Sequence, residues 1–171
     1  FLDSALEGDL WERAEAPLEN LEQAAPGNLV QNLMTAEELL VFSRLMSQVI
    51  DFRSRFTATH SRGVATVAEL LSGLAGFTAK ERLLMAVAGN LHDLGKLAVS
   101  RNLLEKPGPL TPEEFVLMKK HALHTERILC KVAGLERVCE WAAAHHERMD
   151  GTGYPNNLRG EELSLGARIL A

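Results

Sequence analysis

The chain has 171 residues, of which 46% are hydrophobic and 24% charged, with a formal net charge of −5. This length suits one ordinary domain with room for an extra helical segment. The mild negative charge argues against a nucleic-acid polymer as partner, but it leaves a small anionic ligand open because bound metal ions supply positive charge locally. No apolar run is long enough to cross a membrane and no signal peptide is visible, so we expect a cytoplasmic protein without membrane contact in this segment.

The ends of the chain and its two cysteines give further expectations. Residues 1–35 are acidic and weakly patterned, and we interpret them as a connecting or upstream segment. The chain begins with Phe1 and ends at Ala171 within an apolar helical pattern, so we expect it to be a piece of a longer protein. Cys130 and Cys139 are expected to be reduced, buried thiols, because a disulfide framework needs more cysteines and a zinc knuckle needs closer spacing.

Helices are predicted from Thr35 onward, because apolar residues recur every three or four positions. Thr78 and Thr111 each precede an apolar run and have a glutamate three residues later, which is the capping-box pattern of a helix start. No alternating strand pattern is present, so the predicted fold class is all-α. The predicted helices cover residues 39–50, 64–71, 78–91, 111–133 and 138–144 and, after a loop over 147–160, the segment from 165 to the end.

Histidines and one aspartate form a set that predicts a metal centre. Adjacent residues on a helix point about 100° apart, so a doublet reaches one target only if that target is wide or lies at a helix end. Two metal ions about 3.5–4 Å apart are wide enough. Six ligands on one octahedral ion would leave no position for water or substrate, whereas two ions leave several. The candidate ligands are His60, His92, Asp93, His121, His145 and His146.

Asp93 is the only carboxylate in this set, and a carboxylate can bridge two ions whereas a neutral imidazole cannot. We therefore predict that Asp93 is the bridging ligand. Imidazole and carboxylate ligands with open positions suit iron or manganese, with zinc as an alternative.

A purely structural role, without a bound metal, is also open for several of these residues at this point. A single histidine such as His60 or His121 is commonly a surface or hydrogen-bonded core residue. Gly95 could simply cap a helix, and Asp150 with the following glycine could simply form a turn. His124 fits no part of the scheme and is expected to be exposed or to support the ligands. Glu147 and Arg148 are interpreted as a helix end, with support of the site as the alternative.

These residues resemble the HD-GYP domain, a branch of the HD-domain metal-dependent phosphohydrolases. The resemblance rests on the run His92-Asp93-Leu94-Gly95-Lys96, on His121, and on the stretch from His145-His146-Glu147 to Gly153-Tyr154-Pro155. An isolated His-Asp pair is a weak signal, but this ordered set is highly specific. The resemblance covers roughly residues 36–171 and implies an HD-GYP-like domain whose C-terminal part is absent from this chain.

The resemblance implies an HD-domain helical bundle with the GYP signature loop, and a phosphodiesterase that hydrolyses cyclic di-GMP to pGpG and, in some members, on to GMP. By position, one metal would be held by His60, His92 and Asp93, and the other by Asp93, His121, His145 and His146. Asp93 and Lys96 are the implied catalytic residues. Lys96 would contact the scissile phosphate, and Tyr154 lies in the loop that borders the substrate. This loop also implies diguanylate cyclase domains as partners.

Two departures from the family pattern matter. Some members hold a third metal with a glutamate where this chain has Phe56, so we expect two divalent ions. The family's last metal ligand, an aspartate, and the residues for the substrate's far phosphate and guanine lie beyond Ala171. Three alternatives remain: an HD phosphohydrolase acting on another nucleotide, a cyclic di-GMP receptor or docking module without turnover, and an inert helical domain with exposed histidines.

Overall fold

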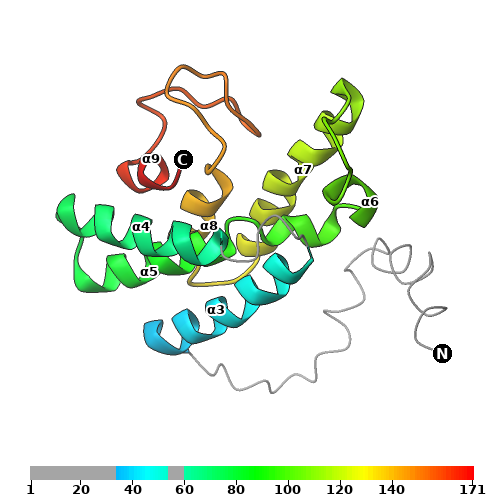
Figure 1. The fold of residues 1–171 in the computed structure, drawn as a ribbon. Coiled ribbons are helices and arrows are strands. Elements are labelled where there is room, and N and C mark those ends of the chain that lie inside the picture. The colour runs from blue at the N-terminus through cyan, green and yellow to red at the C-terminus, as the bar shows by residue number, and fades with distance from the viewer. Residues whose placement is uncertain (1–33, 54–59) are drawn as a thin grey trace, which may run out of the picture. The chain divides into compact units, whose positions relative to one another are not determined.

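The computed structural model describes residues 34–53 and 60–171. Its helices, in chain order, are α3 (Ala36–Phe52), α4 (His60–Leu74), α5 (Ala79–Leu91), the 3-10 helix η2 (Leu94–Ala98), α6 (Arg101–Leu104), α7 (Pro112–Leu129), α8 (Glu136–Ala143) and α9 (Leu165–Leu170). The described residues contain no strand beyond an isolated antiparallel bridge between Asp150 and Arg159. The all-α class is therefore confirmed for this part of the chain (Figure 1).

Capping boxes begin three of the long helices. The side chains of Thr35, Thr78 and Thr111 each accept a hydrogen bond from the backbone N–H three residues later, and the glutamate there accepts one in return. Both predicted start signals are confirmed, and Thr35 adds a third. α7 ends at Leu129, earlier than the predicted stop near Gly134, because the chain already turns toward α8 there.

The core is built around α5, which is buried from Met85 to Leu91 and packs against α3, α4 and α8. α4 and α5 lie side by side in Figure 1. Gly89 permits this close packing, since a Cβ at that position would lie 2.5 Å from the Cα of Ala65. The last turn of α5 is thereby fixed in the core, and it leads directly into His92 and Asp93.

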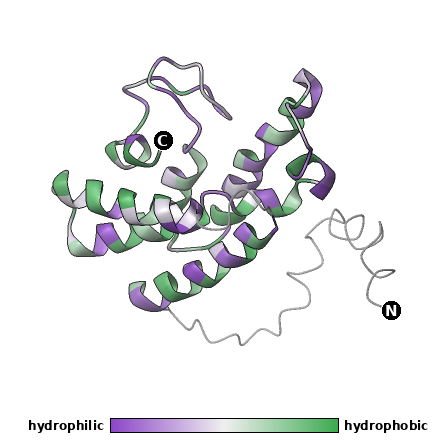
Figure 2. Cartoon of the chain, viewed as in Figure 1, coloured by the Kyte–Doolittle hydropathy of each residue, from purple (hydrophilic) through white to green (hydrophobic). Residues whose placement is uncertain are grey.

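α3 carries polar side chains toward the core and several large apolar ones toward solvent. Asn90 of α5 donates to the Ser43 hydroxyl at 3.0 Å, and Ser61 of α4 donates to the Asp51 carboxylate at 2.7 Å. Phe42 and Leu45 on the same helix are exposed. Figure 2 shows the resulting mixture of polar and apolar residues along α3. Buried hydrogen bonds therefore fasten α3 to the helices that carry the His-Asp doublet and His60.

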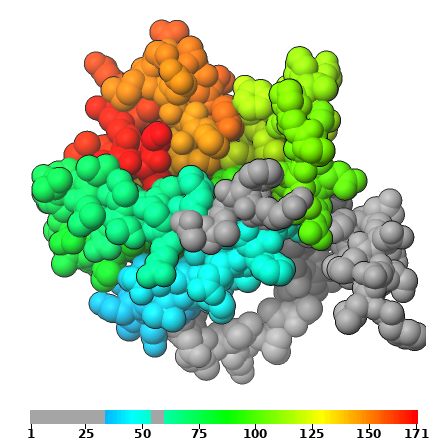
Figure 3. Space-filling view, viewed as in Figure 1, coloured from blue at the N-terminus to red at the C-terminus, as the bar shows by residue number. Residues whose placement is uncertain are grey.

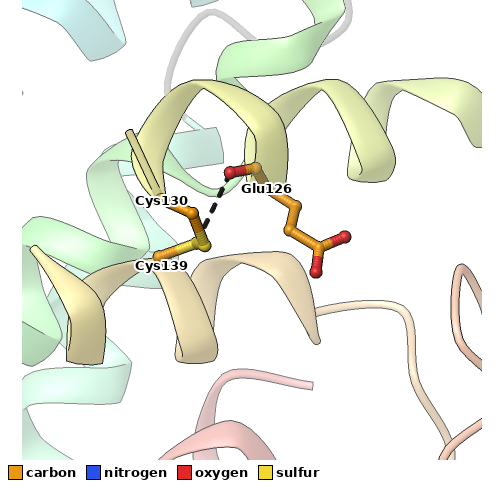
Figure 4. The surroundings of a disulfide bond; sticks show 3 residues. All are labelled: Glu126, Cys130 and Cys139. Carbon is orange, nitrogen blue, oxygen red and sulfur yellow. Dashed lines mark hydrogen bonds between the residues drawn. A yellow bond between two sulfur atoms is a disulfide. The ribbon is translucent and has the colours of Figure 1, made fainter. Parts of the chain in front are cut away.

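Cys130 and Cys139 form a disulfide, which corrects the expectation of two reduced, buried thiols (Figure 4). Cys130 follows the last turn of α7 and is exposed, whereas Cys139 lies within α8 and is buried. The expectation failed because it asked for many cysteines. A single pair is enough where two helices pack together and bring the Cα atoms to 5.4 Å.

No helix among the described residues has the length and apolar character needed to cross a bilayer. Most of the predicted N-terminal segment (residues 1–33) lies outside the described residues, so the predicted domain boundary stays a prediction. Phe56 also lies outside them, in the gap before α4.

Candidate metal centre

Four separate points of the fold bring the predicted ligands together. His60 begins α4, His92 and Asp93 lie between α5 and η2, His121 lies within α7, and the His145-His146 pair follows α8. The ligand atoms form two groups, each with all its atoms within 4.8 Å of one another. One group is His60, His92 and Asp93, and the other is His121, His145 and His146.

The buried Asp93 carboxylate belongs to the first group and also faces the second. Its Oδ2 atom lies 3.1 Å from Nε2 of His92, and its Oδ1 atom lies 3.5 Å from Nε2 of His121 and 3.8 Å from Nε2 of His145. The Oδ1 atom has no hydrogen-bond partner. A buried carboxylate oxygen without a partner is costly, so this atom calls for a positive ligand.

Backbone carbonyls fix the tautomer of three of the rings. The Nδ1 atoms of His92, His121 and His145 lie 2.6–2.7 Å from the carbonyl oxygen three residues earlier in each case. Because a carbonyl only accepts, each Nδ1 must carry the proton. In its neutral form each ring presents a lone pair at Nε2, which is how metal-binding histidines are usually oriented.

These lone pairs point at one another. The Nε2 atoms of His121 and His145 are 3.2 Å apart, and a hydrogen bond between them would require one ring to be an imidazolium. Burial lowers the pKa of both rings, and it lowers the pKa of His146 to about 4, so the rings are neutral at neutral pH. Converging acceptors without a proton between them fit a bound cation, and the donor set of imidazoles with one carboxylate fits a transition metal.

Lys96 is a cation in direct contact with this cluster. Its Nζ donates to Asp93 Oδ2 at 2.6 Å, and its side chain is 19% exposed. Burial alone would raise the pKa of Asp93, but the contact with His92 and the charge of Lys96 outweigh burial and hold that pKa well below its usual range. The carboxylate is therefore ionised and available as a ligand.

A buried threonine connects the two groups, and sequence reasoning missed it. The Thr125 hydroxyl donates to the His92 carbonyl at 3.0 Å and accepts from the Gly95 N–H at 2.9 Å. Gly95 lies within η2 and is not the cap of α5, whose C-cap is His92. A Cβ at Gly95 would lie 1.9 Å from the carbonyl oxygen of His121. The pattern of residues gave no signal for Thr125, except that it lies four residues after His121 on the same face of α7.

The signature loop, residues 147–160, is held in place by contacts with His146 and with Glu147. The Tyr154 ring stacks on His146 at 4.6 Å, and its N–H donates to the His146 carbonyl. The buried Glu147 carboxylate accepts from the N–H groups of Asn156 and Leu158 at 2.7 and 3.0 Å. Glu147 was interpreted from the sequence as a helix end, whereas the structure uses it to hold the loop. Burial and the charge of Asp93 raise the pKa of Tyr154 to about 12, so its phenol stays protonated.

Two other residues stand apart from the cluster. Asp150 is exposed and accepts from the N–H and hydroxyl of Thr152, so the turn interpretation holds for it. His124 is half-buried and belongs to neither ligand group.

Comparison with known proteins gives consistent matches. Residues 44–171 match the family model described as HD domain. The chain is 38% identical to the 3'3'-cGAMP-specific phosphodiesterase 1 of Vibrio cholerae over 79% of its length. It is 34% identical to the cyclic di-GMP phosphodiesterase response regulator RpfG of Xanthomonas campestris over 82%, and 33% identical to a cyclic di-GMP phosphodiesterase of Thermotoga maritima over 74%. These matches cover 31%, 37% and 35% of the relatives, so the chain spans about a third of their length.

Proposed function

Because the chain belongs to the HD-domain family, we propose that it forms the metal-binding part of a phosphodiesterase that hydrolyses cyclic di-GMP to pGpG and, in a second step, to GMP. The observation that carries this proposal is the buried cluster in which imidazole lone pairs converge on Asp93 and one carboxylate oxygen lacks a partner. The names of the Xanthomonas and Thermotoga relatives support cyclic di-GMP as substrate.

In this proposal Asp93 would be a ligand shared by two divalent cations. His60 and His92 would supply further ligands to one cation, and the group of His121, His145 and His146 would supply those of the other. The mixed imidazole and carboxylate set favours iron, with manganese as the alternative. When bound, two such ions supply the positive charge and the acidified water that phosphodiester hydrolysis needs.

Lys96 and Tyr154 act on the substrate. The Lys96 ammonium is held beside the cluster by Asp93 and would bind an oxygen of the scissile phosphate, where it stabilises the charge that builds up in the transition state. The protonated Tyr154 phenol can donate a hydrogen bond at the border of the site. We also propose that the loop carrying Tyr154 contacts diguanylate cyclase domains, and that the protein works in the cytoplasm.

Product analysis of the full-length protein tests this proposal. The protein loaded with iron or manganese is incubated with cyclic di-GMP, and chromatography follows the appearance of pGpG and GMP. We expect turnover that the Asp93→Asn variant lacks. Tight binding of cyclic di-GMP without product in either metal form would instead favour a receptor or docking module.

A hybrid cyclic dinucleotide is the second candidate substrate. Three Vibrio cholerae relatives named as 3'3'-cGAMP-specific phosphodiesterases are 38%, 40% and 36% identical to the chain. The same assay with 3'3'-cGAMP decides between the two, because the substrate with the higher kcat/KM is the preferred one. Another nucleotide becomes the candidate if neither dinucleotide is hydrolysed.

A further inference from the structure

Lys119 lies on α7 two residues before His121 and belongs to neither ligand group. Its Nζ atom is 4.8 Å from the ring centre of Phe115 and 5.0 Å from that of Tyr154. The two rings are 6.5 Å apart and nearly perpendicular. α7 and the signature loop thus hold one ammonium group between two aromatic side chains.

This ammonium lies close to the metal centre, because the same Tyr154 ring contacts it and a proposed ligand. The Tyr154 ring stacks on His146 at 4.6 Å, and the Lys119 Nζ atom lies 5.0 Å from its centre. In Figure 3 the loop that carries Tyr154 lies next to α7, on the face shown. Phe115 is exposed and Lys119 is half-buried, so the cation is accessible at the edge of the site.

Lys119 keeps its charge available. Lys96 donates to Asp93 and Lys106 donates to Glu114, whereas Lys119 pairs with no carboxylate in the part of the chain that the structure describes. Aromatic rings attract a cation without neutralising it, so they restrain the side chain and leave its positive field for a ligand. Restraint before binding also reduces the entropy lost when a ligand arrives.

We infer that Lys119, held by Phe115 and Tyr154, is a further substrate-binding cation for the phosphate that is not cleaved, in addition to the residues that the family resemblance places beyond Ala171. A cyclic dinucleotide carries two phosphates in one small ring, so a substrate with one phosphate beside Lys96 places the other within a nucleotide's length. This inference rests on the proposed function, because a ligand with a single phosphate would give Lys119 no such role.

A purely structural role predicts something different. If Lys119 only tied the signature loop to α7, its loss would disturb the site for every phosphodiester alike. If it binds the second phosphate, its loss weakens the binding of substrates that carry a second phosphate and affects the binding of other substrates less. A substrate pair that differs in this one group therefore separates the two roles.

The test compares cyclic di-GMP with bis(p-nitrophenyl) phosphate, a phosphodiester without a second phosphate, on the metal-loaded full-length protein. Lys119→Met removes the charge and keeps the length of the side chain, and Lys119→Arg keeps the charge. Lys120→Met is the matched control, since Lys120 is the next residue on α7, is exposed and contacts neither ring. The preference for cyclic di-GMP is the ratio of its kcat/KM to that of bis(p-nitrophenyl) phosphate. We expect Lys119→Met to lower this preference about tenfold, mainly through a higher KM for cyclic di-GMP, as loss of one charge-assisted contact does.

Lys119→Arg should recover most of this preference, and Lys120→Met should keep it. An unchanged preference in Lys119→Met would overturn the inference, whether or not overall activity falls. Failure of the proposed function looks different: the wild-type protein would then hydrolyse bis(p-nitrophenyl) phosphate but neither hydrolyse nor bind cyclic di-GMP, and the inference would fall with it.

Discussion

At the scale of single residues, the Thr125 hydroxyl determines how the His-Asp doublet sits against α7. It bonds to the backbone before and after Asp93, through the His92 carbonyl and the Gly95 N–H, and it is fully buried. Residues that orient metal ligands without touching the metal commonly change metal affinity by about 10- to 100-fold when they are lost. Thr125 is therefore a positioning residue for both ligand groups.

Replacement of Thr125 by valine keeps the shape of the side chain and removes both hydrogen bonds. We expect metal affinity to fall by about tenfold or more, since the buried His92 carbonyl and Gly95 N–H lose their partner. Competition with a chelator measures this affinity. Thr125→Ser retains the hydroxyl and should bind metal nearly as the wild type does. Equal affinities for the valine and serine variants would show that the hydroxyl has no positioning role.

At the scale of elements, Glu147 holds the signature loop by accepting two backbone hydrogen bonds. Glu147→Gln replaces one acceptor oxygen with an NH₂ group, which faces an N–H donor, so we expect a loss of about 1–3 kcal/mol of local stability. Hydrogen exchange at the amides of Asn156 and Leu158 measures the change and should become faster.

Glu162 offers a matched control for this experiment. Its carboxylate accepts from the Arg159 N–H in the same loop but is exposed to solvent. Glu162→Gln should therefore leave the amides of Asn156 and Leu158 protected. Unchanged exchange in Glu147→Gln would mean that the loop is held by other contacts.

The disulfide joins α7, which carries His121, to α8, which leads into the His145-His146 pair. Its cysteines are 9 residues apart in sequence, and closing a loop of this size stabilises a fold by about 2–3 kcal/mol. We expect Cys130→Ser to lower the free energy of unfolding by roughly this amount in a denaturant titration under oxidising conditions.

A dithiol reductant should lower the stability of the wild type to that of Cys130→Ser and leave the variant unchanged. Equal stabilities of wild type and variant without reductant would show that the crosslink does not form in solution.

Helix starts and ligand types could be predicted from the sequence because both are local signals. A threonine with a glutamate three residues later marks a cap at Thr78 and Thr111 regardless of the rest of the fold. The ordered histidines and the GYP stretch identified the family, which the comparisons confirm.

The contacts of Thr125 and of the Cys130–Cys139 pair were missed because they depend on how separate helices pack against one another. The Thr125 hydroxyl meets backbone atoms 30 and 33 residues earlier in the chain. Residue types alone gave Glu147 two plausible roles, and only the folded loop shows which one it has. Tertiary packing, rather than local pattern, decides such positions.

At the scale of the whole molecule, the candidate centre exists only when the chain is folded. Its ligands come from α4, the α5–η2 junction, α7 and the segment after α8, and α5 in the core fixes the position of Asp93. Metal binding and folding are coupled in such a site, because no preformed set of ligands is present in the unfolded chain. The central claim is therefore a two-ion centre organised by one buried carboxylate.

Elemental analysis of the purified full-length protein tests this claim most directly. We predict about two transition-metal ions per chain in the wild type, and the loss of both in Asp93→Ala, because the bridging ligand serves both ions. His124→Ala, at a histidine outside both ligand groups, is the control and should retain the wild-type content. A stoichiometry near one or three in the wild type, or full metal content in Asp93→Ala, would contradict the account.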